Sequence, residues 1–288
     1  MQRTRLATLS VVMVGVLAGP LLANDVQITP DVVYGHKFGL ALTFDVYTPT
    51  ENANGAGVLF MVSGGWFSFW GPPEKALERF KPLTDKGFTV FAVRHGSSPK
   101  FSIPEAVADV RRSVRFVRLN ADRFKVDADR LGVYGASAGG HLSLVLGTAS
   151  DNGDPTAKDP VLKVSDRVAA VVAWVAPTDL TIMVWAAPDH LPAYDRFPAL
   201  ELDLDKAKLY SPLHHVTADD APTLLVVGDE DKLVPMQHSH QIQAKFETTN
   251  VASQLIVLEG AGHGFRGKHA DRAVKELVVW FEKQLAEQ

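Results

Sequence analysis

The stretch that decides the fold is Leu131–Tyr134, followed directly by Gly135-Ala136-Ser137-Ala138-Gly139. The first part is an apolar run of strand length, the second matches the pattern G-x-S-x-G, and a segment of helical character begins at Leu142. The pattern alone is weak, because glycine and serine are common residues. Between a buried strand and a helix, however, it is typical of a tight turn that lifts a nucleophilic serine off a sheet. We therefore predict that Ser137 is a nucleophile, the alternative being a plain glycine-rich connection.

Apolar runs of strand length alternate with segments of helical period from residue 31 onward. Most of the runs are uninterrupted, as expected for parallel strands that are buried on both faces. This alternation predicts an α/β fold, with an open, mostly parallel sheet and helices on both sides. Residues 177–216 break the rhythm and are predicted to be a small insertion over the carboxyl ends of the strands. The predicted strands are 40–47, Val58–Val62, Phe88–Val93, Leu131–Tyr134, Val168–Val175, Thr223–Val227 and Gln254–Leu258.

A nucleophilic serine needs a base, and the base needs an acid that orients it. His263 stands between small residues, after the last predicted strand and before the last predicted helix, so it is the candidate base. The acid is expected after the preceding strand, where Asp229, Glu230 and Asp231 follow one another. We predict Asp231, because its spacing before Pro235 leaves it on the loop. Asp229 is the second candidate, and its other possible role is to cap the turn.

Three motifs together resemble the α/β-hydrolase superfamily: Gly-Ala-Ser-Ala-Gly-Gly-His at 135–141, Gly-x-x-Asp-x-x-Val-Pro at 228–235 and Gly-His-Gly-Phe at 262–265. They are most similar to the esterase branch that includes hormone-sensitive-lipase-like esterases, feruloyl-esterase-like hydrolases and arylformamidases. The resemblance implies an eight-stranded sheet, a Ser137–Asp231–His263 triad and no cofactor. It extends over nearly the whole of residues 24–288, which are predicted to be one catalytic domain.

The chain departs from this family at one position. The family carries His-Gly-Gly after its third strand, and backbone N–H groups of this motif form half of the oxyanion hole. Here the sequence is Ser63-Gly64-Gly65-Trp66-Phe67. Because the donors are main-chain groups, the resemblance implies that Gly65, Trp66 and Ala138 form the hole. The family histidine braces this loop, and Ser63 or Trp66 is expected to share that task.

The predicted reaction is hydrolysis of a small aryl or acetyl ester through an acyl-enzyme. Trp66, Phe67 and Trp185 are candidate substrate-binding residues, and core packing is the alternative role for each. A prolyl-oligopeptidase-like peptidase is less favoured, since no propeller precedes the catalytic domain. An arylformamidase and an inactive hydrolase-fold binding protein are two further interpretations of the same motifs.

The composition narrows the range of partners. The chain has 288 residues, no cysteine, a formal net charge of −4 and no block of Lys or Arg, so nucleic acid is an unfavoured partner. No thiolate metal site is possible, and neither His214-His215 nor His238 with His240 has zinc spacing. Gly262–Gly267 matches G-x-G-x-x-G but stands too near the C-terminus for a dinucleotide-binding unit. We expect neither a cofactor nor a metal.

The first 23 residues have the layout of a secretory signal peptide. Arg3 and Arg5 precede an apolar run from Leu6 to Leu17, and the segment ends at Ala23. The run is shorter than the ~20 apolar residues that a membrane-spanning helix needs. The sequence therefore predicts export to the periplasm or the medium without a membrane span, the alternative being a buried N-terminal helix.

Overall fold

The seven predicted strands and one further strand, β1, form one eight-stranded sheet in the computed structural model, which describes residues 26–286. The strand order is β1-β2-β4-β3-β5-β6-β7-β8. Pairing is antiparallel from β1 through β2 to β4 and parallel in every other pair, which confirms the mostly parallel sheet. The strands are β1 (Val26–Lys37), β2 (Leu40–Pro49), β3 (Gly57–Met61), β4 (Thr89–Val93), β5 (Leu131–Ala136), β6 (Ala170–Trp174), β7 (Thr223–Gly228) and β8 (Ser253–Leu258).

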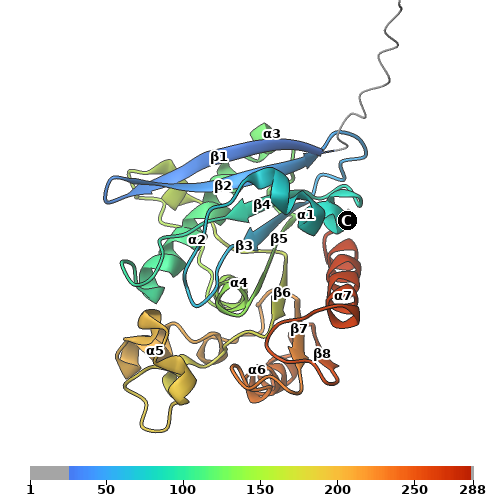
Figure 1. The fold of residues 1–288 in the computed structure, drawn as a ribbon. Helices are drawn as coiled ribbons and strands as arrows, with labels where there is room; N and C mark the ends of the chain where they lie inside the picture. The colour runs from blue at the N-terminus through green and yellow to red at the C-terminus, as the bar shows by residue number, and fades with distance from the viewer. Residues whose placement is uncertain (1–25, 287–288) are drawn as a thin grey trace, which may run out of the picture.

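Helices cover both faces of the sheet, with α1 and α7 on one side and α2, α4 and α6 on the other (Figure 1). The apolar residues of each strand alternate between the two layers: Val133 packs toward α2 and α4, whereas Tyr134 packs toward α7. The helices are α1 (Leu77–Thr84), α2 (Ile103–Leu119), α3 (Ala121–Phe124), α4 (Ala138–Thr148), α5 (Leu204–Leu209), α6 (Gln237–Thr248) and α7 (Lys268–Gln284).

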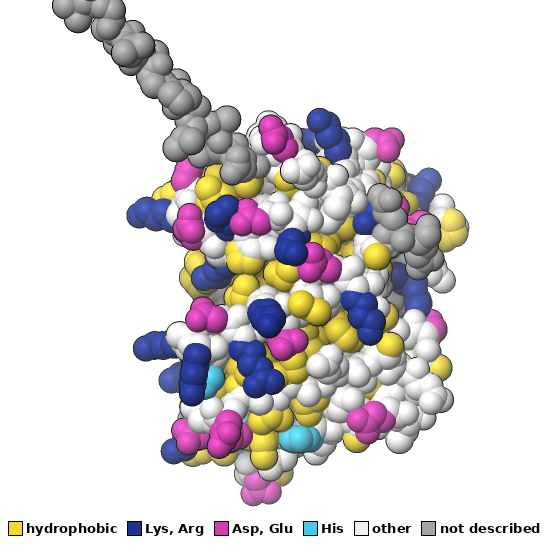
Figure 2. All heavy atoms as spheres, turned by 90° about the vertical axis from the view of Figure 1, so that its right-hand side faces the viewer, with side chains coloured by type: hydrophobic (Ala, Val, Ile, Leu, Met, Phe, Trp, Pro, Cys, Tyr) yellow, Lys and Arg dark blue, Asp and Glu magenta, His cyan; other side chains and the backbone are white. Residues whose placement is uncertain are grey.

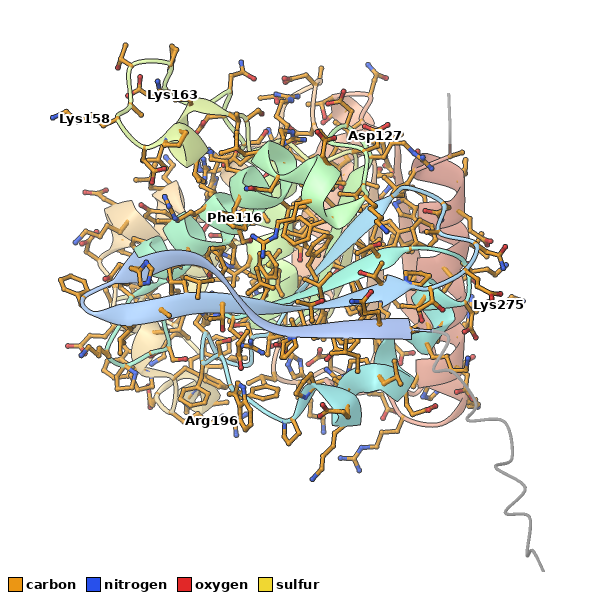
Figure 3. The ribbon with its side chains drawn as sticks, turned by 90° about the horizontal axis from the view of Figure 1, so that it is seen from above. Phe116, Asp127, Lys158, Lys163, Arg196 and Lys275 are labelled. Atoms are coloured by element: carbon orange, nitrogen blue, oxygen red, sulfur yellow. The ribbon has the colours of Figure 1, made fainter. Side chains whose placement is uncertain are left out.

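Strand β1 has no counterpart among the strands predicted from the sequence. Its run is interrupted by Pro30 and Asp31, and its register with β2 shifts twice. The amide of Asp31 donates to the Asp45 carboxylate of β2, which stabilises the irregular stretch. The resulting long hairpin lies along the edge of the molecule nearest the viewer in Figure 3. Strand β1 therefore pairs with β2 although its own sequence has only a weak strand pattern.

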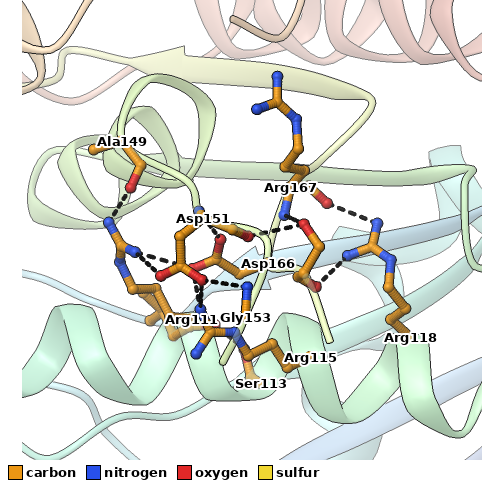
Figure 4. A network of polar contacts seen from close by, with 11 residues as sticks. Arg111, Ser113, Arg115, Arg118, Ala149, Asp151, Gly153, Asp166 and Arg167 are labelled. Atoms are coloured by element: carbon orange, nitrogen blue, oxygen red, sulfur yellow. Dashed lines mark hydrogen bonds and ion pairs between the residues drawn. The ribbon is translucent and has the colours of Figure 1, made fainter. Parts of the chain in front are cut away.

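Helix α2 begins as its sequence suggests, with Ser102 and Glu105 forming a capping box. The arginines of α2 lie outside its apolar face, yet they bond to other parts of the protein and not to solvent alone. Arg115 is 8% exposed and pairs with Asp151 and Asp166, while Arg118 donates to the carbonyls of Ser165 and Arg167 (Figure 4). These contacts fasten the segment that leads from α4 to β6 onto α2.

The predicted insertion is present between β6 and β7. It carries the short helix α5 and several 3₁₀ turns, which explains why it shows neither strand nor helix periodicity. Its first residues are held by α6: the amide and hydroxyl of Thr178 bond to Nδ1 and the carbonyl of His238. The 3₁₀ turns of the chain are η1 (Pro73–Ala76), η2 (Pro160–Lys163), η3 (Leu180–Ile182), η4 (Pro192–Tyr194), η5 (Pro198–Leu200) and η6 (Pro212–His214).

Residues 1–25 lie outside the described part of the chain, so the predicted signal peptide stays a prediction. Within residues 26–286, no helix combines the length and apolar character needed to cross a bilayer.

Candidate active site

Ser137 stands at the tight turn between β5 and α4. Its backbone has φ 54° and ψ −123°, a conformation that non-glycine residues rarely adopt. The neighbouring glycines make this turn possible, because a Cβ on Gly135 would lie 2.3 Å from the carbonyl carbon of Gly139. A Cβ on Gly139 would lie 2.6 Å from the carbonyl oxygen of Met61. The G-x-S-x-G spacing thus lets α4 start against the ends of β3 and β5.

The structure brings Ser137, His263 and Asp231 together from three separate loops. Nε2 of His263 lies 2.9 Å from Oγ of Ser137, and Nδ1 lies 2.9 Å from Oδ2 of Asp231. With Nδ1 protonated toward the carboxylate, Nε2 is free to accept the serine proton. The Asp231 side chain is fully buried, whereas the His263 side chain is 26% exposed. This is the geometry of a nucleophile, a base and an orienting acid.

The loop after β7 separates the two acid candidates. Oδ1 of Asp231 accepts the amides of Leu233 and Val234, both at 2.9 Å, so its Oδ2 faces the histidine. Oδ1 of Asp229 instead accepts the amide of Gly260 at 2.7 Å and joins the loops after β7 and β8. The Asp229 side chain therefore links two loops, which is neither the role of the orienting acid nor the capping of its own turn.

The predicted oxyanion loop is a tight turn after β3. The amides and carbonyls of Gly64 and Phe67 bond reciprocally, at 2.9 and 3.0 Å. Between them, Gly65 and Trp66 have φ values of 56° and 57°. Within the described residues, the amides of Gly65 and Trp66 donate no backbone hydrogen bond. The turn approaches the start of α4, where Ala138 offers the helix N-terminal amide.

Two side-chain contacts brace this loop. The Ser63 hydroxyl lies 2.9 Å from Nε2 of His95, whose Nδ1 lies 2.8 Å from the carbonyl of Gly96. The Trp66 indole N–H donates to Nδ1 of His141 at 3.1 Å. Trp66 is only 3% exposed, so its side chain packs beneath the loop in the protein interior. It is not part of an open substrate surface. Ser63 and Trp66 thus both brace the loop, and their partners are histidines that the local sequence did not indicate.

Both partner histidines are held neutral by burial. Desolvation lowers the pKa of His95 and of His141 to about 4. Each imidazole therefore has one protonated and one free nitrogen: the backbone carbonyl fixes the proton, and the free nitrogen accepts the bond from Ser63 or Trp66. His95 lies two residues after the end of β4, and a polar residue at the carboxyl end of a buried parallel strand is a sequence signal for a functional role.

The aromatic candidates lie in different surroundings. Phe67 is 52% exposed, and Trp185 is 37% exposed with its indole N–H bonded to the carbonyl of Tyr194. Phe197, which sequence reasoning did not select, lies against the oxyanion loop, since a Cβ on Gly65 would be 2.6 Å from its ring. The insertion thus reaches the loop through Phe197, which is how it covers this end of the sheet.

No group of three or more His, Asp or Glu side chains within residues 26–286 is arranged to hold a metal ion. The side chains of Ser137, His263 and Asp231 form a chain of hydrogen bonds, and the second oxygen of Asp231 is held by two backbone amides.

A known protein family and several esterases resemble this chain in sequence and fold. The BD-FAE family model matches residues 44–246, which is more than half of the chain. The chain is similar to the probable carboxylic ester hydrolase LipM of Mycobacterium tuberculosis, with 29% identity over 91% of this chain and 64% of that protein. It is also similar to esterase LipQ of the same organism, with 25% identity over 82% of this chain and 57% of that protein. The chain thus spans about three fifths of the length of these relatives.

Among solved structures, a truncated carbohydrate esterase from gut microbiota superposes with a TM-score of 0.74 at 26% identity, covering 91% of this chain and 98% of that one. The superposition therefore extends over most of the fold. The chain therefore belongs to the BD-FAE family and has the α/β-hydrolase fold, with carboxylic ester hydrolases among its relatives.

Proposed function

We propose that this protein is an exported serine hydrolase that cleaves small aryl or acetyl carboxylic esters. The observation that carries the proposal is the continuous chain Ser137–His263–Asp231, with both contacts at 2.9 Å and Ser137 on the strained turn. The esterase relatives support the reaction class, and the Arg3–Ala23 segment supports export.

In the proposed reaction, Oγ of Ser137 attacks the carbonyl carbon of the ester while Nε2 of His263 takes the serine proton. The resulting oxyanion lies between the amide of Ala138 and those of Gly65 and Trp66. Collapse of the tetrahedral intermediate breaks the C–O bond, and His263 gives its proton to the departing alkoxide. Water then attacks the acyl-serine, again losing its proton to His263, and the carboxylic acid leaves.

The helix that follows Ser137 adds to the stabilisation of the oxyanion. The N-terminus of α4 begins at Ala138, so its free amides and its dipole favour negative charge at this point. The exposed rings of Phe67, Phe69 and Trp70 continue from the oxyanion loop and offer an apolar surface for an aryl or acyl group.

A direct test compares hydrolysis of nitrophenyl acetate and butyrate with that of aminoacyl nitroanilides and of an N-formyl arylamine. We expect the esters to be the fastest substrates, and Ser137→Ala to lower kcat by about 10⁶. A fluorophosphonate should label the wild type and leave Ser137→Ala unlabelled. Faster turnover of the nitroanilide or the formamide would replace the proposal by a peptidase or a formamidase. Absence of both turnover and labelling would favour a binding protein.

A further inference from the structure

A cavity of about 1030 Å³ lies on the α1–α7 side of the sheet. Its inner end is lined by Ala136 and His263, so it begins beside the candidate active site; Ser137 is not among its lining residues. The view of this side of the molecule shows apolar side chains running between basic and acidic ones (Figure 2). We call this cavity the α1–α7 groove.

The floor of the α1–α7 groove is a row of aromatic side chains contributed by successive strands. Phe60 of β3 and Tyr134 of β5 have ring centroids 4.8 Å apart, and Trp174 of β6 lies 6.1 Å from Tyr134. Phe265, on the loop after His263, extends the row at 6.1 Å from Trp174. A floor of adjacent rings favours a planar aromatic ligand, which gains ring–ring contacts in addition to apolar burial.

Two donors on this floor lack partners. Tyr134 is 3% exposed and lines the groove, yet its hydroxyl makes no hydrogen bond within residues 26–286. Burial raises the pKa of Tyr134, so the hydroxyl keeps its proton. The indole nitrogen of Trp174 is buried and likewise has no acceptor in the described structure. Of the two, the Trp174 nitrogen is shielded on all sides, so the Tyr134 hydroxyl is the donor that the floor offers to an acceptor in the groove.

One cation stands above the same floor. The guanidinium carbon of Arg79 lies 5.4 Å from the centroid of the Phe60 ring, and the side chain forms no ion pair within the described residues. The Phe60 ring lies 4.8 Å from the ring of Tyr134, so the guanidinium and the hydroxyl belong to neighbouring parts of the floor. Lys86 is different, because it pairs with Glu282 at 2.8 Å and joins α1 to α7. Lys275 also lines the groove, and its side chain extends outward from α7 in Figure 3.

We propose that the α1–α7 groove binds a planar aromatic carboxylate. The ring lies on the floor formed by Phe60, Tyr134 and Trp174, and the carboxylate lies between the guanidinium of Arg79 and the hydroxyl of Tyr134. This is a ligand site distinct from the ester site at Ser137, and it goes beyond the proposed function. Its occupant lies next to His263 without taking part in acyl transfer.

The probe is 2-naphthoate, whose binding is measured by isothermal titration calorimetry. We expect one site per chain in the wild type. Because a charge-assisted hydrogen bond contributes about 1.5–3 kcal/mol, Arg79→Gln should weaken binding about 10-fold or more. Tyr134→Phe, which keeps the ring, should weaken it by a smaller factor. Arg272→Gln removes an exposed cation of α7 that does not line the groove and should leave the affinity unchanged.

Two further measurements separate the groove from the ester site. Protein whose Ser137 carries a small methylphosphonyl group should bind 2-naphthoate as the unmodified protein does, and 2-naphthol should bind more weakly and not respond to Arg79→Gln. Val274→Trp, which fills the groove from α7, should abolish binding of both compounds. Lack of binding by the wild type, equal affinity in all variants, or loss on phosphonylation would overturn the proposal. These titrations need no turnover, so their result is independent of whether the protein hydrolyses esters.

Discussion

Oδ2 of Asp231 faces Nδ1 of His263 at 2.9 Å, while the second oxygen of the same carboxylate is held by two backbone amides. The amides fix the carboxylate, and the carboxylate fixes the imidazole with Nε2 toward Ser137. The loop after β7 thus determines the orientation of the His263 imidazole.

Asp231→Asn should lower kcat by about 10⁴, because the amide favours the wrong tautomer of His263. Asp229→Asn is the matched control, because Asp229 is exposed, lies two residues away and uses its side chain to accept the Gly260 amide. Its kcat should stay within a few-fold of the wild type. Steady-state kinetics on a nitrophenyl ester measure both, and the reverse ranking would mean that Asp229 is the orienting acid.

The oxyanion loop should tolerate loss of the Ser63 hydroxyl better than a change at Gly65. Gly65→Ala places a Cβ 2.6 Å from the Phe197 ring at a φ of 56°, so it displaces the amides of the turn. Losing one such donor costs ~10²–10³ in kcat. Ser63→Ala removes only a bond to His95 and should cost less than tenfold in kcat.

Phe197→Ala supplies the control for this comparison, since it opens the space that the new Cβ needs. The double variant Gly65→Ala/Phe197→Ala should recover part of the lost kcat. An equal loss of kcat in Ser63→Ala and Gly65→Ala would make the hydroxyl a direct donor to the oxyanion.

Three buried histidines should make the fold sensitive to acid. Burial lowers the pKa of His95, His141 and His238 to about 4 from 6.5. Between these values the unfolded chain binds protons that the folded chain does not, so stability is full above pH 6.5 and is lost as the pH falls. Three such groups together contribute up to about 4 kcal/mol per pH unit.

Urea unfolding at pH 5 and pH 7.5 measures this effect. His141→Gln should lower the difference in the free energy of unfolding between the two pH values, whereas substitution of the exposed His240 by Gln should leave it as it is. An unchanged difference in His141→Gln would mean that His141 is already protonated in the folded protein.

The arginine network of α2 should depend on Asp166, which is fully buried between Arg111 and Arg115. Asp166→Ala removes the buried one of the two carboxylates that Arg111 and Arg115 share and leaves them Asp151, which should cost about 1–3 kcal/mol in the free energy of unfolding. The exposed pair Arg167–Asp219 provides the comparison, and Asp219→Ala should cost less than about 1 kcal/mol. Chemical denaturation followed by circular dichroism checks both, and equal effects would show that burial of the network is unimportant.

If the first 23 residues are a signal peptide, their removal gives the exported protein a defined N-terminus. When the full chain is expressed in a bacterium with a secretion pathway, the protein outside the cytoplasm should begin near Asn24. N-terminal sequencing tests this, and exchanging Val12–Val16 for polar residues should retain the protein in the cytoplasm. Exported protein that keeps Met1 would contradict the cleavage.

The local sequence determined the parts of this protein that depend on short-range patterns. The uninterrupted strand runs, the glycines around Ser137 and the loops with Asp231 and His263 each carry their signal within a few residues. The sheet, the insertion and the three residues of the candidate triad could therefore be predicted before the structure was known.

Contacts between distant segments decided the rest. Strand β1 has a broken pattern and exists because β2 pairs with it. His95 and His141 hold the oxyanion loop across 32 and 75 residues of sequence, so no local spacing indicates them. The residue type of Trp66 suggested a substrate-binding role, but the side chain is buried, bonds to His141 and braces the oxyanion loop. The α1–α7 groove likewise exists only because β3, β5 and β6 place Phe60, Tyr134 and Trp174 side by side, since tertiary packing determines which side chains meet and which polar groups remain unpaired.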